Sequence, residues 1–512
     1  MKISPLLLLS LCLSATSLSL TVQAEEAKTA KNTTVQIDAD SVVVTEHETT
    51  VLDNDFSYKA YTGTQPVWDE QGNPTAAIFY TYYERQDVKD RKSRPLLISF
   101  NGGPGSASVW MQIAYTGPKA LNVDSEGYPL QPYGVKQNPY SVLDTADIVF
   151  VNPVNTAYSR VLPGKDGKMP GRDEQGKMFF GVNADIKYLA EWVNTFVSRY
   201  NRWESPKYLI GESYGTTRVS GLALALQNQQ WMYLNGVVLV SPTEIGIKRD
   251  GPVDVANRLP YFAATAWYHK ALSSDLQQKD LTDYLPEVEE FTLNTYLPAL
   301  AKGNSLPDAE KQQIAEQVAK YSGLSVKAVL QNNLDINTDF FWKELLRERG
   351  QTVGRLDSRY LGIDKKDAGS EPDYNAELTS WLHSFTPAIN NYLKNELNYK
   401  TDVKYNMFGN VHPWDRSNDN TGEDLRQAMA QNPYLHVMTQ SGYYDGATNY
   451  FDAKYNMWQL DPSGKMKNRL SFKGYRSGHM MYLRYDDLRQ SNQDLRDFIK
   501  ATLPKPDQPA KY

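Results

Sequence analysis

The chain contains a single cysteine among its 512 residues, and that cysteine, Cys12, lies near the N-terminus. Residues 1–24 have the layout of a secretory signal peptide: Lys2 supplies a positive charge, residues 6–13 are apolar, and Ala24 ends a small-residue cleavage site. The rest of the chain has no cysteine. Cleavage after Ala24 would leave a protein without disulfides, thiol nucleophiles or cysteine-bound metals.

Long hydrophobic runs are also lacking. The N-terminal apolar stretch is diluted by serines and falls short of the roughly 20 apolar residues that span a bilayer. We therefore expect an exported protein, either periplasmic or secreted, that has no membrane attachment once the signal peptide is removed.

The chain has no large excess of charge of either sign. It has 54 Lys and Arg residues and 60 Asp and Glu residues, and neither sign of charge gathers in long blocks along the sequence. The absence of a basic patch excludes nucleic acid as a partner. The six histidines show no spacing typical of metal ligands, so we predict no metal. We also predict no cofactor, because the glycine-containing stretches at 101–106 and 171–178 lack the Lys-Ser or Lys-Thr pair of a phosphate-binding loop.

Short apolar runs predict the fold class. Residues 42–84 alternate β-branched and aromatic runs with turn residues, which predicts antiparallel strands. Later runs are almost entirely apolar, as expected of strands buried on both faces of a parallel sheet; they are residues 96–100, 148–151, 208–210, 237–240 and 436–438. Residues 183–200 carry apolar side chains at helical spacing. The alternation predicts an α/β fold with a largely parallel central sheet.

Charged, helix-compatible stretches between residues 248 and 431 interrupt this alternation, and apolar strands return only after them. We predict that this segment is a helical cap insertion over the sheet. The predicted organisation is a signal peptide (1–24), a flexible leader with the first strands (25–56), the first part of the core (57–247), the insertion (248–431), the second part of the core (432–505) and a polar tail (506–512).

The sequence Gly-Glu-Ser-Tyr-Gly at residues 211–215 follows an apolar strand and precedes a helix-compatible run. Glycines on both sides of Ser213 relieve crowding in a sharp strand-to-helix turn that exposes the serine hydroxyl, and a helix N-terminus favours developing negative charge. An isolated match of this kind is also typical of an ordinary glycine turn. The flanking strand and helix favour Ser213 as a nucleophile.

A second glycine-rich loop, Asn-Gly-Gly-Pro-Gly-Ser at residues 101–106, follows another apolar strand. Acyl transfer needs two N–H donors that face the tetrahedral oxyanion, usually one from the residue after the nucleophile and one from an upstream loop. We predict that the amides of Tyr214 and Gly103 form this oxyanion hole.

A serine hydrolase also needs a general base and an acid that orients it. His479 lies in a Ser-Gly turn beyond the strand-like run 470–475, and Asp445 lies in a glycine turn after residues 434–440. The chain order Ser213, Asp445, His479 is that of the α/β hydrolases, and we predict these three as the catalytic residues. Taken alone, an aspartate in a glycine turn is more often structural.

Together, the glycine loop, the serine motif, the Asp445 turn and the Gly-His-Met sequence at 478–480 resemble the serine carboxypeptidase family. The resemblance follows the same order across residues 57–243 and 434–503. It implies an α/β-hydrolase fold, a Ser-Asp-His triad and removal of C-terminal residues from peptide or protein substrates.

The resemblance also implies that Asn101, Gly102 and Glu212 bind the terminal carboxylate of the substrate. Two ionised carboxylates would repel each other, so a proton shared between Glu212 and the substrate would be favoured and binding would weaken as pH rises. In an alternative interpretation, Glu212 orients a backbone N–H or Arg218. The chain departs from the family at Tyr115, where familiar eukaryotic members carry a second acidic residue upstream of a Gly-Pro pair.

The leading hypothesis is therefore an exported serine carboxypeptidase that forms an acyl-enzyme. A second hypothesis keeps the triad but changes the reaction to ester hydrolysis, acyl transfer or another peptidase mode, with Tyr115 as its main support. A third is a non-catalytic binding protein, for which 34 Tyr and 10 Trp residues supply stacking surfaces, but the complete triad argues against it. The sequence predicts neither the side-chain preference nor the oligomeric state.

Overall fold

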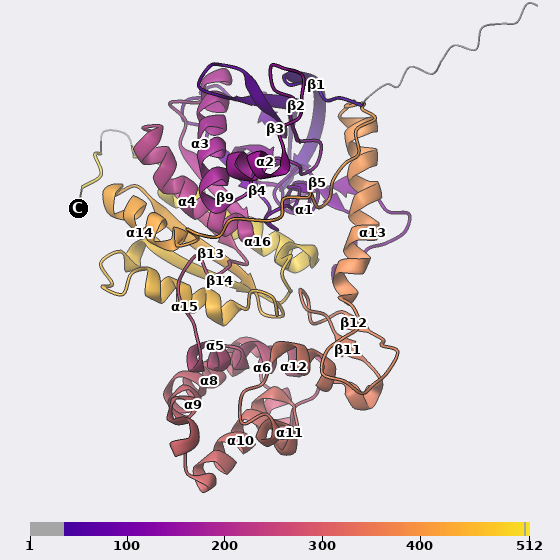
Figure 1. Ribbon diagram of the computed structural model, residues 1–512, viewed down its shortest axis with the longest axis vertical. Coiled ribbons are helices and arrows are strands. Elements are labelled where there is room, and N and C mark those ends of the chain that lie inside the picture. Colours follow the sequence, from indigo (N-terminus) through magenta and orange to yellow (C-terminus); the bar gives the residue numbers. More distant parts are fainter. Residues whose placement is uncertain (1–34, 506–507, 512) are drawn as a thin grey trace, which may run out of the picture. The chain divides into compact units, whose positions relative to one another are not determined.

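The computed structural model describes residues 35–505 and 508–511 (Figure 1). The predicted signal peptide, the first part of the leader and residues 506, 507 and 512 of the predicted tail lie outside the described residues. All elements named below belong to the contact unit Ile37–Tyr512.

A ten-stranded sheet organises the described part of the chain. Its order is β1 (Ser41–Val51), β2 (Asn54–Trp68), β3 (Pro74–Arg85), β7 (Asp147–Val151), β4 (Leu96–Phe100), β9 (Lys207–Glu212), β10 (Gly236–Val240), β13 (His436–Gly442) and β14 (Leu470–Tyr475), and β8 (Arg160–Val161) pairs with β3. Strands β1, β2, β3 and β7 pair antiparallel, whereas every pair from β7 to β14 is parallel. The predicted antiparallel start and parallel centre are both confirmed.

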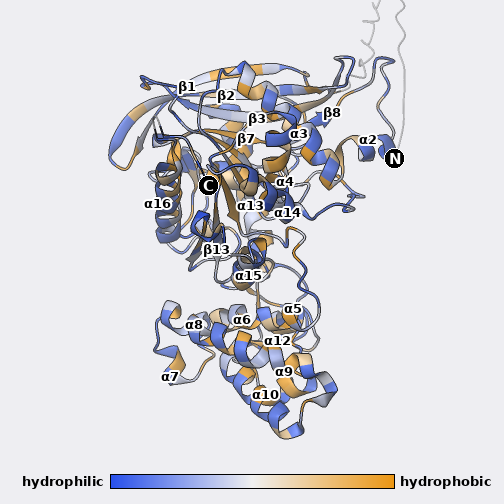
Figure 2. Ribbon diagram, turned by 90° about the vertical axis from the view of Figure 1, so that its left-hand side faces the viewer, coloured by the Kyte–Doolittle hydropathy of each residue, from blue (hydrophilic) through white to orange (hydrophobic). Residues whose placement is uncertain are grey.

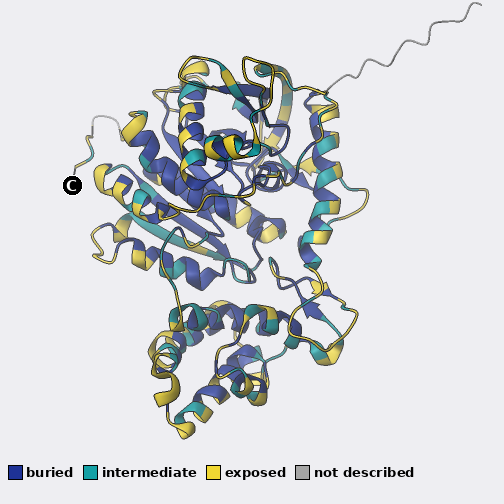
Figure 3. Ribbon diagram, in the orientation of Figure 1, coloured by how far each residue is buried: buried dark blue, intermediate teal, exposed yellow. Residues whose placement is uncertain are grey.

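Alternate residues of the central strands enter two different apolar clusters. In β4, Leu97 belongs to the cluster on one face, and Leu96 and Ile98 belong to the cluster on the other. All five residues of this strand are buried, and Figure 3 shows the same dark blue along the central strands. Burial of both faces explains why these strands read as continuous apolar runs.

Helices cover both faces of the sheet. One cluster includes residues of α1 (Val109–Ala114), α13 (Ala376–Asn391) and α16 (Tyr485–Thr502). The other includes α2 (Arg172–Phe179), α3 (Val182–Arg199), α4 (Tyr214–Gln229) and α14 (Thr421–Gln431). Helix α15 (Tyr450–Leu460) follows β13. The remaining elements of this part are the pairs β5 (Lys119–Leu121) with β6 (Val135–Gln137) and β11 (Thr352–Val353) with β12 (Leu361–Gly362), and the short helices η1 (Val142–Asp144), η5 (Tyr392–Glu396), η6 (Lys467–Arg469) and η7 (Met481–Leu483).

The helices of the insertion share a third apolar cluster, which also includes Tyr444, Tyr450 and Phe451 from the chain after β13. These helices are α5 (Pro252–Asn257), α6 (Leu259–Tyr268), α7 (Ser274–Gln277), α8 (Leu281–Phe291), η2 (Thr292–Tyr296), α9 (Leu297–Lys302), η3 (Gly303–Ser305), α10 (Asp308–Ser322), α11 (Val326–Gln331), α12 (Thr338–Glu344) and η4 (Arg347–Arg349). Figure 2 shows hydrophobic and hydrophilic residues side by side on these helices, as expected of elements that bury one face.

The packing divides the predicted insertion at 248–431. Helices α5–α12 share the third cluster, but α13 and α14 pack into the two clusters of the sheet. Trp381 and Phe385 of α13 join the cluster of α1, and Leu425 of α14 joins that of α4. The helices that share the third cluster thus end before α13, since apolar spacing marks a buried helix face without showing what buries it.

The start of the parallel sheet is fixed by a buried carboxylate. Asp147, at the first position of β7, accepts hydrogen bonds from Arg94 Nε (2.7 Å), Arg202 Nη1 (2.6 Å) and Arg91 Nη1 (3.0 Å). Arg202 is itself fully buried and also donates to Tyr82 Oη (2.6 Å). These contacts join β7 to segments before β4 and after α3.

We predict that Arg202→Met lowers the free energy of unfolding by about 3 kcal/mol or more, because it leaves a buried carboxylate short of a partner. Lys92→Met is the matched control, since Lys92 and Glu204 form an exposed pair that contributes about 0–1 kcal/mol. Urea unfolding followed by tryptophan fluorescence measures both changes. Equal effects of the two substitutions would contradict the prediction.

Candidate active site

The three predicted catalytic residues follow three parallel strands. Ser213 follows β9, Asp445 lies beyond the end of β13, and His479 lies beyond β14. Strand β10 separates β9 from β13, which pairs directly with β14. Parallel strands have their carboxyl ends at one edge of the sheet, so all three residues lie at that edge, where open α/β sheets place their ligands.

Ser213 occupies the sharp turn that its motif predicts. Its backbone lies in a strained region with φ +57° and ψ −128°, directly between β9 and α4. A Cβ atom on Gly211 would lie 2.2 Å from the carbonyl oxygen of Gly215, so only glycine fits this side of the turn. The turn places a half-buried serine at the N-terminus of α4.

Asp445 and His479 form a hydrogen-bonded pair. Nδ1 of His479 lies 2.7 Å from Oδ2 of Asp445, and the carboxylate is fully buried. Asp445 also accepts from the amides of Ala447 (2.9 Å) and Thr448 (3.0 Å) and from the Thr448 hydroxyl (2.7 Å). An acceptor carboxylate fixes the proton on Nδ1, which leaves Nε2 of the neutral ring able to accept a proton.

The end of β10 bonds to both the turn of Ser213 and the loop of His479. The amide of Ser213 donates to the carbonyl of Val240 (2.9 Å), and the hydroxyl of Ser241 donates to the carbonyl of His479 (2.7 Å). Within the described structure, Oγ of Ser213 makes no hydrogen bond with His479. Such contacts are often long in free enzymes and shorten when substrate binds.

The environment of His479 favours its protonated form. Burial alone lowers the pKa of the imidazole, but the charge and hydrogen bond of Asp445, together with the charge of Glu212, raise the pKa above its ordinary value. A buried carboxylate that raises the pKa of a neighbouring imidazole stabilises the imidazolium that forms when the ring takes up a proton.

The glycine loop after β4 packs against the serine turn. A Cβ atom on Gly102 would lie 2.4 Å from the amide nitrogen of Tyr214, so the two segments are in backbone contact. The amides of Gly103 and Tyr214 have no acceptor among the described residues. Two unpaired N–H groups on adjoining segments are the arrangement that stabilises an oxyanion.

Glu212 and Asn101, two of the predicted carboxylate-binding residues, contact each other. Nδ2 of Asn101 donates to Oε1 of Glu212 (2.9 Å), and the hydroxyl of Tyr482 donates to Oε2 (2.5 Å). Burial raises the pKa of Glu212 to about 7, although the charge of His479 and the two hydrogen bonds oppose this shift. Arg218, the alternative partner in the sequence interpretation, bonds instead to Asp185 (2.7 Å).

Tyr115 stands where an acidic residue is expected from the resemblance. It is fully buried and lies beside Tyr482, which donates a hydrogen bond to Glu212. Its ring stacks on that of Tyr482 with centroids 4.7 Å apart, and its hydroxyl donates to Gln440 Oε1 (2.6 Å). Sequence reasoning missed Tyr482 and Thr448, because no spacing rule marks a hydroxyl that supports a catalytic carboxyl group from another loop.

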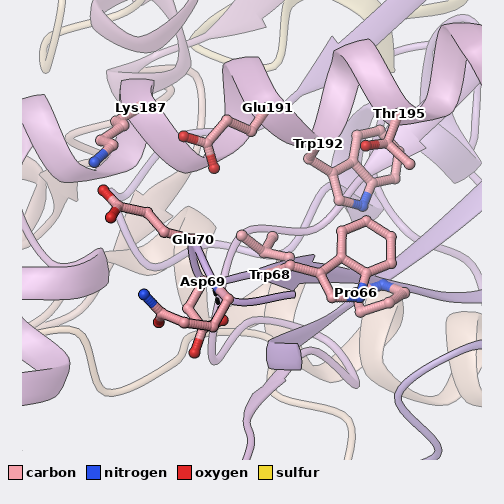
Figure 4. Close-up of a pocket in the computed structure, with 10 residues that line it drawn as sticks. Pro66, Trp68, Asp69, Glu70, Lys187, Glu191, Trp192 and Thr195 are labelled. Atoms are coloured by element: carbon pink, nitrogen blue, oxygen red, sulfur yellow. Dashed lines mark hydrogen bonds between the residues drawn. The ribbon is translucent and has the colours of Figure 1, made fainter. Parts of the chain in front are cut away.

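A surface cavity of about 760 Å³ lies elsewhere, between the turn after β2 and helix α3 (Figure 4). Trp68, Glu70, Lys187 and Glu191 are among its lining residues, and none of the predicted site residues lines it. In the described ranges, no three His, Cys, Asp or Glu side chains gather as a metal site. No helix of those ranges has the length and apolarity to cross a membrane.

Comparison with protein families and curated proteins gives consistent matches. The family model for serine carboxypeptidases matches residues 51–478. Serine carboxypeptidase-like 36 from Arabidopsis thaliana is 29% identical over 197 residues, or 37% of this chain and 36% of that protein. The pheromone-processing carboxypeptidase KEX1 of Saccharomyces cerevisiae (strain JAY291) is 26% identical over 162 residues, or 31% of this chain and 20% of that protein. The chain therefore matches only about a third or less of these relatives' length.

Among solved structures, a prohormone-processing carboxypeptidase from Saccharomyces cerevisiae superimposes with a TM-score of 0.52 at 14% sequence identity. The alignment covers 88% of this chain and 93% of that one. This likeness concerns the fold, and the predicted α/β-hydrolase fold is confirmed.

We predict that Asp445→Asn lowers the pKa of His479, because the charge that opposes the effect of burial is removed. Thr448→Val keeps the charge of Asp445 and removes a hydroxyl that bonds to Asp445 (2.7 Å) and lies 3.2 Å from Nδ1 of His479, so it should shift the pKa less. NMR titration of ¹⁵N-labelled histidine measures these values, with half-buried His436 as an internal reference. An unchanged pKa of His479 in Asp445→Asn would refute the electrostatic role of Asp445.

Proposed function

Because this chain belongs to the serine carboxypeptidase family, we propose that it hydrolyses C-terminal peptide bonds through an acyl-enzyme formed on Ser213. The proposal rests on the 2.7 Å hydrogen bond between His479 and Asp445. This bond lies at the sheet edge where Ser213 follows β9 in a strained backbone conformation. Peptides or proteins with a free C-terminus are the proposed substrates.

The proposed reaction begins when Oγ of Ser213 attacks the scissile carbonyl carbon and Nε2 of His479 takes the hydroxyl proton. Asp445 holds the imidazolium, and the amides of Gly103 and Tyr214 donate to the oxyanion. His479 then returns the proton to the leaving amine, and the C-terminal amino acid departs. Water, activated by His479, hydrolyses the acyl-enzyme and restores the serine.

Asn101, Gly102 and Glu212 are the proposed acceptors of the terminal carboxylate. A Glu212 with a pKa of about 7 is largely protonated in acid, so it can donate a hydrogen bond to the substrate rather than repel it. Binding is then complete below the pKa of Glu212 and is lost as pH rises through it. This arrangement supports an exopeptidase whose recognition of the terminal carboxylate is strongest in acid.

We also propose export of the enzyme, to the periplasm or the medium, on the strength of the predicted signal peptide at residues 1–24. A second candidate function uses the same triad for ester hydrolysis, acyl transfer or internal peptide cleavage. It is favoured by Tyr115, which supplies a stacked phenol rather than a second acid next to Glu212.

We predict that the protein shortens N-blocked peptides stepwise from their free C-terminus, and that Ser213→Ala reduces turnover by about 10⁶-fold without unfolding the chain. Mass spectrometry at about pH 5 and about pH 7.5 follows the products. Amidated copies of the same peptides are the control and should resist cleavage. Internal cleavage, or none despite stoichiometric fluorophosphonate labelling of Ser213, would support the second candidate function instead.

A further prediction concerns pH. For peptides with a free C-terminus, KM should rise up to about tenfold per pH unit above about pH 7, as Glu212 ionises. Glu212→Gln cannot ionise, so its KM should stay flat from about pH 6 to about pH 8. Steady-state kinetics across this range measure both profiles.

Tyr482→Phe also tests the role of Glu212. The Tyr482 hydroxyl stabilises the ionised form of Glu212, so removal of this hydroxyl raises the pKa of Glu212 and should move the rise in KM to higher pH. Identical profiles for the wild-type protein and Glu212→Gln would remove Glu212 from carboxylate recognition.

A further inference from the structure

Residues 354–360 form a buried segment between the insertion and the catalytic loops. They connect the short strands β11 and β12, which follow the last helices of the insertion. Apart from Arg355 and Leu356, every residue of the 354–360 segment is buried. A loop buried to this extent needs partners for its backbone groups, and those partners include the loops that carry Asp445 and His479.

Three backbone hydrogen bonds join the 354–360 segment to the catalytic loops. The amide of His479 itself donates to the carbonyl of Leu356 (2.7 Å), and the amide of Gly446, next to Asp445, donates to the carbonyl of Arg355 (3.0 Å). The amide of Ser358 donates to the carbonyl of Tyr444 (2.9 Å). The segment therefore bonds to both catalytic loops at once.

The 354–360 segment also packs tightly against the loop that carries His479. A Cβ atom on Gly478 would lie 2.5 Å from the carbonyl oxygen of Leu356 and 2.5 Å from Cβ of Asp357. Only a glycine before His479 allows this approach. The backbone of the base cannot shift toward the insertion without displacing the segment.

Side chains from several elements hold the segment in turn. Glu377, in the first turn of α13, accepts a hydrogen bond from the amide of Leu356 (2.9 Å). Asp357 pairs with Arg359 (2.6 Å), and both side chains are buried. His269, just after α6, bonds through Nε2 to the carbonyl of Ser358 (2.6 Å). The segment is thus anchored both to the insertion and to a helix that packs on the sheet.

We propose that the 354–360 segment positions His479 relative to Asp445, with Glu377 as a positioning residue that acts through the peptide group of Leu356. The proposal rests on the proposed function of the triad. Asp445 and His479 follow different strands, and no covalent constraint sets the distance between their loops. Because misplacement of a catalytic group by about 1 Å can lower a rate by about 100-fold, a bridge that bonds to both loops affects the chemical step.

The test compares Glu377→Ala with Glu377→Gln, which keeps an oxygen acceptor for the amide of Leu356. Glu289→Ala is the matched control: Glu289 lies in α8 and tethers the insertion to α15 through Lys454 (2.8 Å) and Tyr450 (3.0 Å), away from the segment. Fluorophosphonate titration gives the concentration of active sites, so that loss of folded protein is not counted as loss of rate.

We expect Glu377→Ala to lower kcat about tenfold per active site with KM within about twofold of the wild-type value. Glu377→Gln and Glu289→Ala should retain kcat within about twofold. Equal losses in Glu377→Ala and Glu289→Ala, a loss confined to KM, or no loss would each overturn the proposal. Wild-type protein that fails to react with fluorophosphonate would instead contradict the proposed function.

The pH profile of kcat adds a readout that a purely structural role would not change. The charges that act on His479 are those of Asp445, Glu212 and Arg355. If Glu377→Ala loosens the contact with Asp445, the pKa of the base falls and the acid limb of kcat moves to lower pH. An acid limb that stays in place would contradict this step.

Should Glu377→Ala yield no active sites, Arg359→Lys provides a second variant. Lysine keeps a positive charge beside Asp357 but cannot reproduce the forked contact of the guanidinium. We expect the same pattern of lowered kcat and retained KM, and wild-type values for both constants would overturn the proposal.

Discussion

The shared direction of strands β9, β10, β13 and β14 is the constraint on which the candidate site depends. Because these strands are parallel neighbours, their carboxyl ends bring together loops that are more than 200 residues apart in the sequence. The serine turn follows one strand, the acid another and the base a third, while the end of β10 bonds to both the amide of Ser213 and the carbonyl of His479. The sheet thus fixes the relative positions of the loops that carry the candidate catalytic residues.

Where burial or a steric rule acts on neighbouring residues, the sequence is sufficient to predict structure. The run 96–100 is apolar because β4 is covered on both faces, and it was predicted as a strand for that reason. Ser213 was predicted in a sharp turn because glycines flank it, and its positive φ agrees with that reasoning. The pair of Asp445 and His479 required more, since only the chain order and the strands before them connected two residues 34 positions apart.

Features that depend on distant partners could not be predicted from local patterns. The spacing of Trp381 and Phe385 predicts a helix with a buried face, but only tertiary packing shows that this face lies against the cluster of α1 rather than within the insertion. Leu356 contributes to the base loop through its carbonyl group, which every residue possesses, so no side-chain motif could reveal it. The same applies to Tyr482, whose hydroxyl reaches Glu212 across 270 positions of sequence.

If Glu212 binds the carboxylate of the substrate as proposed, its surroundings explain how the site can do so without a second acidic residue. A pair of carboxyl groups shares a proton because two adjacent negative charges repel each other. Here burial has the same effect on one carboxyl group, since it raises the pKa of Glu212 to about 7 before any substrate carboxylate arrives. Tyr115 stacks on Tyr482, and the Tyr482 hydroxyl limits the shift by stabilising the ionised form of Glu212. On this proposal, burial takes the place of a second acid as the source of the raised pKa, and Glu212 remains a carboxyl group that can carry a proton near neutral pH.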